Sequence, residues 1–154
     1  MKIYIAAPLY DEGEKDFNLK IDTLIRSWGY DTFLPQRDGG IVALMPDIVE
    51  GMPKEDYVFK TDIKNMNESD VFLFLLDGRV PDEGACVALG NCFANHKHCV
   101  GYKTDIRSLC GDDNLMIKKA LDKICYSIEE LKQYLDQIGW LSPYFFMFFM
   151  KKFS

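Results

Sequence analysis

The alternation of apolar and polar residues along the chain predicts five short strands separated by helices. The apolar runs that predict buried strands are Ile3–Ala6, Asp31–Leu34, Val71–Leu76, Cys99–Tyr102 and Ile124–Tyr126. The run at Val71–Leu76 is the most apolar of the five. Strands that alternate with helices favour a parallel, doubly wound α/β sheet.

Apolar residues at helical spacing and capping residues mark the helices. Asp11 with Glu14 predicts the start of the first helix, and Ser127 with Glu130 forms a capping box for a final helix that ends at Gln137. Three more helices are expected at 54–67, 84–95 and 114–123. Residues 35–53 form a long connection rich in glycine and proline, and a connection of that length is usually functional or mobile. The apolar stripe of the first helix is Phe17, Ile21, Leu24, Ile25 and Trp28.

Right-handed crossovers favour the flavodoxin-like strand order 2-1-3-4-5 for these five strands, with helices on both faces of the sheet. This order places the carboxyl ends of the first and third strands side by side at the switch point, where such folds bind ligands. The loop Ala7–Tyr10 would therefore face the turn Gly78–Gly84. Pro8, Leu9 and Gly84 are candidates for substrate contact on this ground.

Composition narrows the classes of function. At 154 residues the chain fits one domain, and its net charge of −6 argues against a nucleic-acid partner, which needs a basic face. Its cysteines form no CxxC pair and no metal spacing, a pattern typical of free thiols in a reducing cytoplasm. His96 and His98 lack a third metal ligand, and no GxGxxG or Walker loop follows the first strand. We therefore expect a cytoplasmic protein with no metal and no cofactor.

The last residues differ from the rest of the chain. Residues 141–154 contain a run of aromatic residues and methionines that is too short to span a bilayer, which takes about 20 apolar residues. We expect this tail to pack over the core or at a subunit interface rather than to contact a membrane.

Acidic and hydroxyl groups near the strand ends remain as candidates for chemistry. Tyr4 lies inside the first strand, and Asp62 lies on the helix before the third strand. Asp82 follows the third strand, where it either caps the next helix or serves in a site. The second strand is followed by hydrogen-bond donors and acceptors at Gln36, Arg37 and Asp38. Such a group suits the binding of a planar heterocycle or simply an exposed turn.

Ala88 lies on the inward stripe of the helix that follows Asp82, together with Ala85, Leu89 and Cys92. A small residue there suits the packing of a helix on a sheet. The same position is at the mouth of the expected cleft, where the positive end of the helix dipole would keep a carboxylate ionised.

Five short segments, in this order along the chain, resemble the nucleoside 2-deoxyribosyltransferase family. They lie at residues 2–9, 34–38 (LPQRD), 70–78, 81–90 and 114–116 (NLM). The resemblance covers about residues 2–138. It implies a transferase-like domain at residues 1–139, followed by the apolar tail at 140–154.

The resemblance also implies a reaction. The family exchanges the base of a 2′-deoxynucleoside for another free base by a retaining double displacement, in which a glutamate forms a covalent deoxyribosyl intermediate. By resemblance, Tyr4 would position that glutamate, and Asp62 would act as general acid and then as general base. Asp82 would hold a deoxyribose hydroxyl, and residues 36–38 would line the base site. Asn114 and Met116 would reach the sugar bound in a neighbouring subunit, which implies a homo-oligomer.

The chain departs from the family at the nucleophile. The family's pattern D-x-G-x-x-x-E-x-G places its glutamate at Ala88, so the resemblance implies a chain that binds nucleosides but is nearly inactive. Three explanations account for the alanine: a deliberate Glu-to-Ala substitution, a non-catalytic homologue, or a nucleophile moved to Glu83. The intact surrounding motifs favour the first, and the different direction expected for Glu83 in the turn argues against the third.

Two other functions are compatible with the same fold. A related group resembling this fold cleaves 2′-deoxynucleoside 5′-monophosphates with water as the acceptor. The segment Asn114–Met116 is neither hydroxyl-rich nor basic, which favours an unphosphorylated 5′-hydroxyl instead. The non-enzymatic alternative is a receiver-like or nucleotide-sensing module. A receiver would carry an acidic cluster after the first strand, where this chain has Ala6–Pro8.

Overall fold

A five-stranded parallel sheet forms the centre of the computed structural model, which describes residues 1–78, 80–105 and 114–140. The strands are β1 (Lys2–Ala6), β2 (Asp31–Phe33), β5 (Val71–Leu75), β6 (His98–Tyr102) and β7 (Lys123–Cys125), in the order β2-β1-β5-β6-β7. Numbered along the chain among themselves, these strands follow the order 2-1-3-4-5. The prediction of a flavodoxin-like sheet is therefore confirmed.

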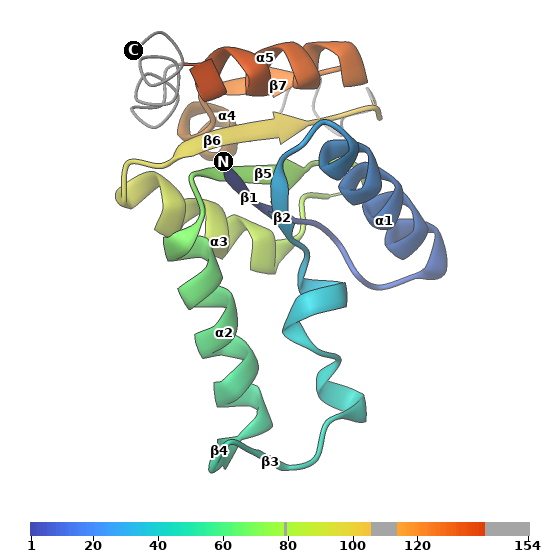
Figure 1. The fold of residues 1–154 in the computed structure, drawn as a ribbon, viewed down its shortest axis with the longest axis vertical. Helices are drawn as coiled ribbons and strands as arrows, with labels where there is room; N and C mark the ends of the chain where they lie inside the picture. Colours follow the sequence, from blue (N-terminus) through green and yellow to red (C-terminus); the bar gives the residue numbers. More distant parts are fainter. Residues whose placement is uncertain (79, 106–113, 141–154) are drawn as a thin grey trace, which may run out of the picture.

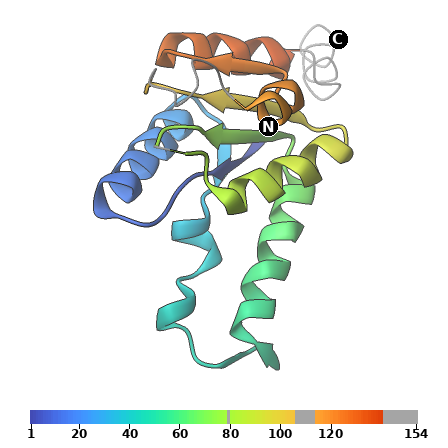
Figure 2. The same ribbon diagram turned by 180° about the vertical axis from the view of Figure 1, so that it is seen from behind.

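Helices cover both faces of this sheet (Figures 1 and 2). They are α1 (Glu12–Ser27), α2 (Lys54–Glu68), α3 (Glu83–Ala94), α4 (Leu115–Ala120) and α5 (Ile128–Trp140). Side chains that alternate along β1 divide the core between the two faces. Ile3 and Ile5 share a buried cluster with residues of α1 and α5, whereas Tyr4 and Ala6 share another with residues of α2 and α3. The face covered by α2 and α3 holds the candidate site.

Both predicted helix starts, at Asp11 and Ser127, are present. The Asp11 carboxylate accepts a hydrogen bond from Glu14 N at 2.9 Å, and the Glu14 carboxylate accepts one from Asp11 N at 3.2 Å. Before α5, Ser127 Oγ accepts from Glu130 N at 3.2 Å, while the Glu130 carboxylate reaches Tyr126 N at 2.9 Å. The α5 helix extends to Trp140, beyond its predicted end at Gln137.

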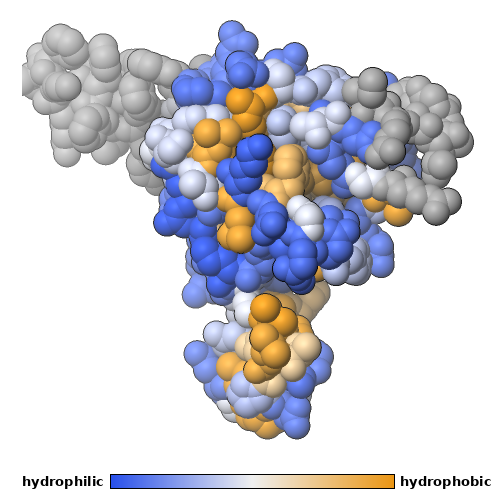
Figure 3. Space-filling model, turned by 90° about the vertical axis from the view of Figure 1, so that its right-hand side faces the viewer, coloured by the Kyte–Doolittle hydropathy of each residue, from blue (hydrophilic) through white to orange (hydrophobic). Residues whose placement is uncertain are grey.

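The long connection predicted at residues 35–53 contains short regular elements. It contains a π-helical turn (Pro35–Gly39), a 3-10 turn (Val42–Leu44) and a hairpin of β3 (Ile48–Val49) and β4 (Met52–Pro53). Together with α2, this segment extends past the sheet as an arm, with the hairpin at its tip (Figures 1 and 2). Apolar surface gathers on the arm (Figure 3). Its exposed apolar residues include Ile41, Leu44 and Ile48.

Within the described part of the chain, no helix has both the length and the apolar character needed to cross a bilayer. The apolar tail predicted at residues 140–154 lies outside the described residues, except for the backbone of Trp140 at the end of α5.

Candidate active site

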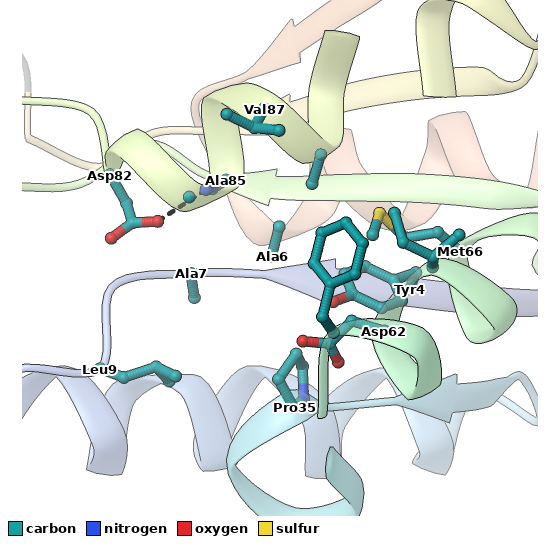
Figure 4. Close-up of a pocket in the computed structure, with 14 residues that line it drawn as sticks. Tyr4, Ala6, Ala7, Leu9, Pro35, Asp62, Met66, Asp82, Ala85 and Val87 are labelled. Carbon is teal, nitrogen blue, oxygen red and sulfur yellow. Dashed lines mark hydrogen bonds between the residues drawn. The ribbon is translucent and has the colours of Figure 1, made fainter. Parts of the chain in front are cut away.

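A cavity of about 380 Å³ lies at the carboxyl end of β1, between α2 and α3 (Figure 4). Residues of the loop after β1 and of the turn before α3 both line it, as the strand order predicts. Of the residues expected in a site, those that line this cavity are Tyr4, Leu9, Asp62, Asp82, Gly84 and Ala88.

Asp62 is the titratable group on α2 that faces the cavity (Figure 4). Its Oδ1 atom is buried and has no hydrogen-bond partner among the residues that the structure describes. Burial raises the pKa of this carboxyl from 3.8 to about 6, and the neighbouring Tyr4 hydroxyl opposes part of that rise. Because a buried carboxylate oxygen without a partner is costly, a ligand that hydrogen-bonds to Asp62 would stabilise this site.

Tyr4 forms the floor of the cavity beside Asp62. Its side chain is buried and stacks against Phe33 at 5.3 Å and against Phe72 at 6.1 Å between ring centroids. Burial and the adjacent Asp62 charge both raise the pKa of the Tyr4 hydroxyl. The phenol therefore stays neutral and available as a hydrogen-bond donor.

The turn at Pro35–Gly39 packs directly against Asp62. A Cβ atom added at Gly39 would lie 3.3 Å from Asp62 Oδ1 and 3.8 Å from the Pro35 Cβ atom. The absence of a side chain at Gly39 thus lets the backbone lie against the carboxyl and exclude water from one side of it.

Arg37 holds this turn in place through bonds to the body of the domain. Its guanidinium contacts Asp22 Oδ2 at 2.5 Å, Asp38 Oδ2 at 2.6 Å and the Thr32 carbonyl oxygen at 2.9 Å. Asp22 lies on α1, and its side chain is only 4% exposed. The ion pair with Asp22 therefore ties the turn to α1, and the hydrogen bond to the Thr32 carbonyl oxygen ties it to β2.

The expected base-contacting residues Gln36, Arg37 and Asp38 are not among the residues that line the cavity. Gln36 Nε2 donates to the Lys15 carbonyl oxygen at 2.9 Å, and the Gln36 amide oxygen accepts from Asn18 Nδ2 at 3.0 Å. All three side chains thus make bonds that stabilise the turn. Their contact with a base stays a prediction.

Asp82 serves as the N-cap of α3 and also lines the cavity. Its Oδ1 atom accepts a hydrogen bond from Ala85 N at 2.7 Å (Figure 4). Asp82 thus both caps α3 and lines the cavity, so the capping role and a role in a site are compatible. At Gly84, an added Cβ atom would lie 3.3 Å from the same Asp82 Oδ1.

Ala88 lies on α3 with its side chain buried to 8% exposure, among the core residues that face α2 and the sheet. It also lines the cavity. A longer side chain at position 88 would extend into that space. Glu83, the alternative nucleophile, is exposed and does not line the cavity.

Three expected substrate contacts lie elsewhere in this chain. Pro8 lines a separate cavity of about 240 Å³ together with Phe17 and Asp77. Asn114 caps α4 by accepting a hydrogen bond from Met116 N at 2.9 Å. Asn114 and the 78% exposed Met116 line a groove of about 510 Å³ on the outer side of α3 and α4. Neither lines the cavity that holds Asp62.

The cavity also contains residues that the sequence did not single out, notably Pro35, Phe59 and Val87. Phe59 precedes Asp62 by three positions on α2, so helical spacing from Asp62 was the signal that could have revealed it. Among the described residues, no group of three or more His, Cys, Asp or Glu side chains is arranged to hold a metal ion.

Comparisons with known proteins agree with this architecture. A family model described as nucleoside 2-deoxyribosyltransferase matches residues 3–134. A 2-deoxyribosyltransferase from Bacillus psychrosaccharolyticus superposes with a TM-score of 0.71 at 21% identity, over 85% of this chain and 90% of that one. A conserved protein from Enterococcus faecalis V583 superposes with a TM-score of 0.74 at 22% identity, over 88% of this chain and 97% of that one.

A CMP N-glycosidase from Clostridium botulinum is more distant, with a TM-score of 0.58 at 15% identity, over 88% of this chain and 99% of that one. At these identities the structural likeness establishes the fold. No curated protein sequence matches the chain.

Proposed function

The chain belongs to the nucleoside 2-deoxyribosyltransferase family, and we propose that the cavity between α2 and α3 binds a 2′-deoxynucleoside. The observation that carries this proposal is the buried Asp62 Oδ1, which has no partner among the described residues and faces a largely apolar cavity. A nucleobase supplies the missing partner, because its ring nitrogens exchange hydrogen bonds with a carboxyl group in either protonation state.

Proton exchange with the base is the proposed role of Asp62. With a pKa of about 6, the carboxyl is partly protonated near neutral pH. A neutral acid donates a proton to a departing base, and the resulting carboxylate accepts one from an incoming base. Tyr4 lies beside this carboxyl, and Asp82 in the same cavity offers an oxygen to a deoxyribose hydroxyl.

We propose that position 88 supplies the nucleophile in active relatives and that this chain, with alanine there, binds nucleosides without appreciable base exchange. In the retaining double displacement, a carboxylate attacks the anomeric carbon while the bond to the base breaks, and Asp62 gives its proton to the base. The second base then attacks the same carbon, the ester bond breaks, and Asp62 takes the proton back. An alanine methyl group forms no such bond.

The preferred substrate is a nucleoside rather than a nucleotide. The described residues that line the cavity include no Lys or Arg. A 5′-phosphate would therefore be buried without a counter-charge, which is costly. We further propose that Asn114 and Met116, exposed on α4, reach the sugar bound by a neighbouring subunit of a homo-oligomer.

The test is the substitution Ala88→Glu. We expect the variant to exchange the base of a deoxynucleoside with a free purine, measured by chromatography of the products. Ala88→Gln is the matched control, because it adds the same volume without a nucleophile and should stay inactive.

A Glu variant that binds nucleoside normally yet forms no new nucleoside would contradict the assignment of position 88. Exchange at equal rates by the Glu and Gln variants would contradict the covalent mechanism. Calorimetry with a nucleoside and its 5′-monophosphate tests the substrate class. Tighter binding of the monophosphate would favour the alternative function, hydrolysis of 2′-deoxynucleoside 5′-monophosphates.

A further inference from the structure

One helix stripe of α2 lines the cavity with Phe59, Asp62, Ile63 and Met66, at the spacing i, i+3, i+4, i+7. The inner end of the stripe is buried, since Met66 is 5% exposed. Phe59, at the outer end, is 65% exposed. The stripe therefore places an uncovered aromatic ring at the mouth of the cavity.

Packing of the domain does not explain Phe59. The aromatic residues Tyr4, Phe33 and Phe72 that stack beneath the cavity belong to a buried cluster, and Phe59 belongs neither to that cluster nor to the residues packed against it. An apolar ring that lines a cavity without joining the core is available to a ligand.

The rim of the cavity is apolar on more than one side. Leu9 in the loop after β1 is 39% exposed, and Val87 on α3 is 72% exposed. Both line the cavity with Phe59, and Val87 lies on the helix across from Asp62 (Figure 4). Exposed apolar side chains from three elements thus surround the opening, while Oδ1 of Asp62 is buried within the cavity. A ligand with apolar faces and a polar edge matches this distribution.

We propose that Phe59 is the stacking platform for the nucleobase, so that it determines affinity for the base while Asp62 contacts the edge of the ring. Side chains at i and i+3 of a helix are neighbours, about 5–6 Å apart at their Cβ atoms. A heterocycle hydrogen-bonded to Asp62 therefore presents one face within reach of Phe59. Purines gain more than pyrimidines, because the larger ring system covers more of the phenyl face. This inference rests on the proposed function.

Binding of 2-aminopurine 2′-deoxyriboside tests the platform, because stacking quenches the fluorescence of this base. We expect the intact chain to bind the probe with quenching. Phe59→Ala should weaken binding by about 5- to 150-fold, the range that loss of one base–aromatic stack produces, and should abolish the quenching. Phe59→Trp should keep both. Phe59→Leu preserves an apolar side chain and should lose the quenching.

A matched control is available at Tyr126, an aromatic residue that is 52% exposed and does not line the cavity. Tyr126→Ala should bind the probe as the parent chain does.

The outcomes separate the two proposals. If the parent chain binds no deoxynucleoside, the proposed function fails. If the parent binds but Phe59→Ala or Phe59→Leu binds with unchanged affinity and quenching, the platform is refuted and the proposed function stands. A loss of affinity that is equal for purine and pyrimidine deoxynucleosides would also refute it.

Discussion

Replacing Asp62 by asparagine should stabilise the fold, and the gain should grow with pH. The native state holds this carboxyl at a pKa of about 6 because of burial, against 3.8 for an exposed aspartate. Ionisation therefore costs more in the folded chain than in the unfolded chain. Stability is highest below the unfolded pKa, where the group is neutral in both states, and declines as pH rises through the folded pKa.

The magnitude follows from the two pKa values. A difference of about two pKa units corresponds to about 3 kcal/mol of folding free energy above pH 6, as an upper bound. Asp62 is only partly buried, so solvent screening reduces the cost, and we expect about 1–3 kcal/mol. Asparagine has nearly the same shape and stays neutral at every pH. Its advantage over aspartate should be smaller at about pH 4.5 than at pH 8, by up to about 2 kcal/mol.

Urea unfolding at several pH values, followed by circular dichroism, measures this difference, provided that the m-value stays constant. Asp56→Asn provides a control on an exposed position of the same helix. Any effect of the asparagine amide on stability is the same at all pH values. Only the pH dependence of the difference in unfolding free energy therefore reports the ionisation of Asp62. A free-energy difference that does not change with pH, or one that favours aspartate at pH 8, would refute the burial argument.

Two further substitutions test how the site is held in place. In urea unfolding, Arg37→Ala should destabilise the chain by about 3–5 kcal/mol, because it leaves the Asp22 carboxylate buried without its cation. A loss below about 1 kcal/mol would show that the Pro35–Gly39 turn does not depend on this ion pair. Asp82→Ala should lower the free energy of unfolding by about 0.5–2 kcal/mol through loss of the α3 cap, whereas Asp82→Asn should retain most of the stability. If thermal unfolding shows the same loss of stability for both variants, the capping role is contradicted.

The parts of the fold that the sequence predicted depend on local patterns. The alternation in β1, with Ile3 and Ile5 on one face and Tyr4 and Ala6 on the other, appears in the sequence as an uninterrupted apolar run because both faces are covered. Strand order followed from the handedness of crossovers, a rule that needs no knowledge of individual contacts. The strand order brings the loop Ala7–Tyr10 to the turn Gly78–Gly84, and residues of both segments line the cavity.

The turn at residues 35–39 could not be predicted in this way, because the contacts that form it are distant in sequence. Arg37 pairs with Asp22, and Gln36 pairs with Asn18. A polar run after a strand is equally consistent with a ligand site and with an anchored turn, and local spacing does not distinguish them. The sequence does not distinguish Phe59 from a core residue, because an aromatic residue on a helix stripe ordinarily packs into the core.

The two carboxyl positions of the site, Asp62 on α2 and residue 88 on α3, require different protonation states for the proposed chemistry. Burial already holds Asp62 at a pKa of about 6. A glutamate at position 88 would lie in the second turn of α3 and face the same cavity as Asp62. Its negative charge would raise the pKa of Asp62 further, because two carboxyl groups in one cavity do not ionise independently. The fold would thus separate the pair into a nucleophile and an acid at the same pH. Under the proposed mechanism, alanine at position 88 removes the nucleophile and leaves Asp62, the cavity and the exposed Phe59 ring in place. The proposed mechanism therefore predicts that nucleoside binding and base exchange are separable by a single side chain on α3.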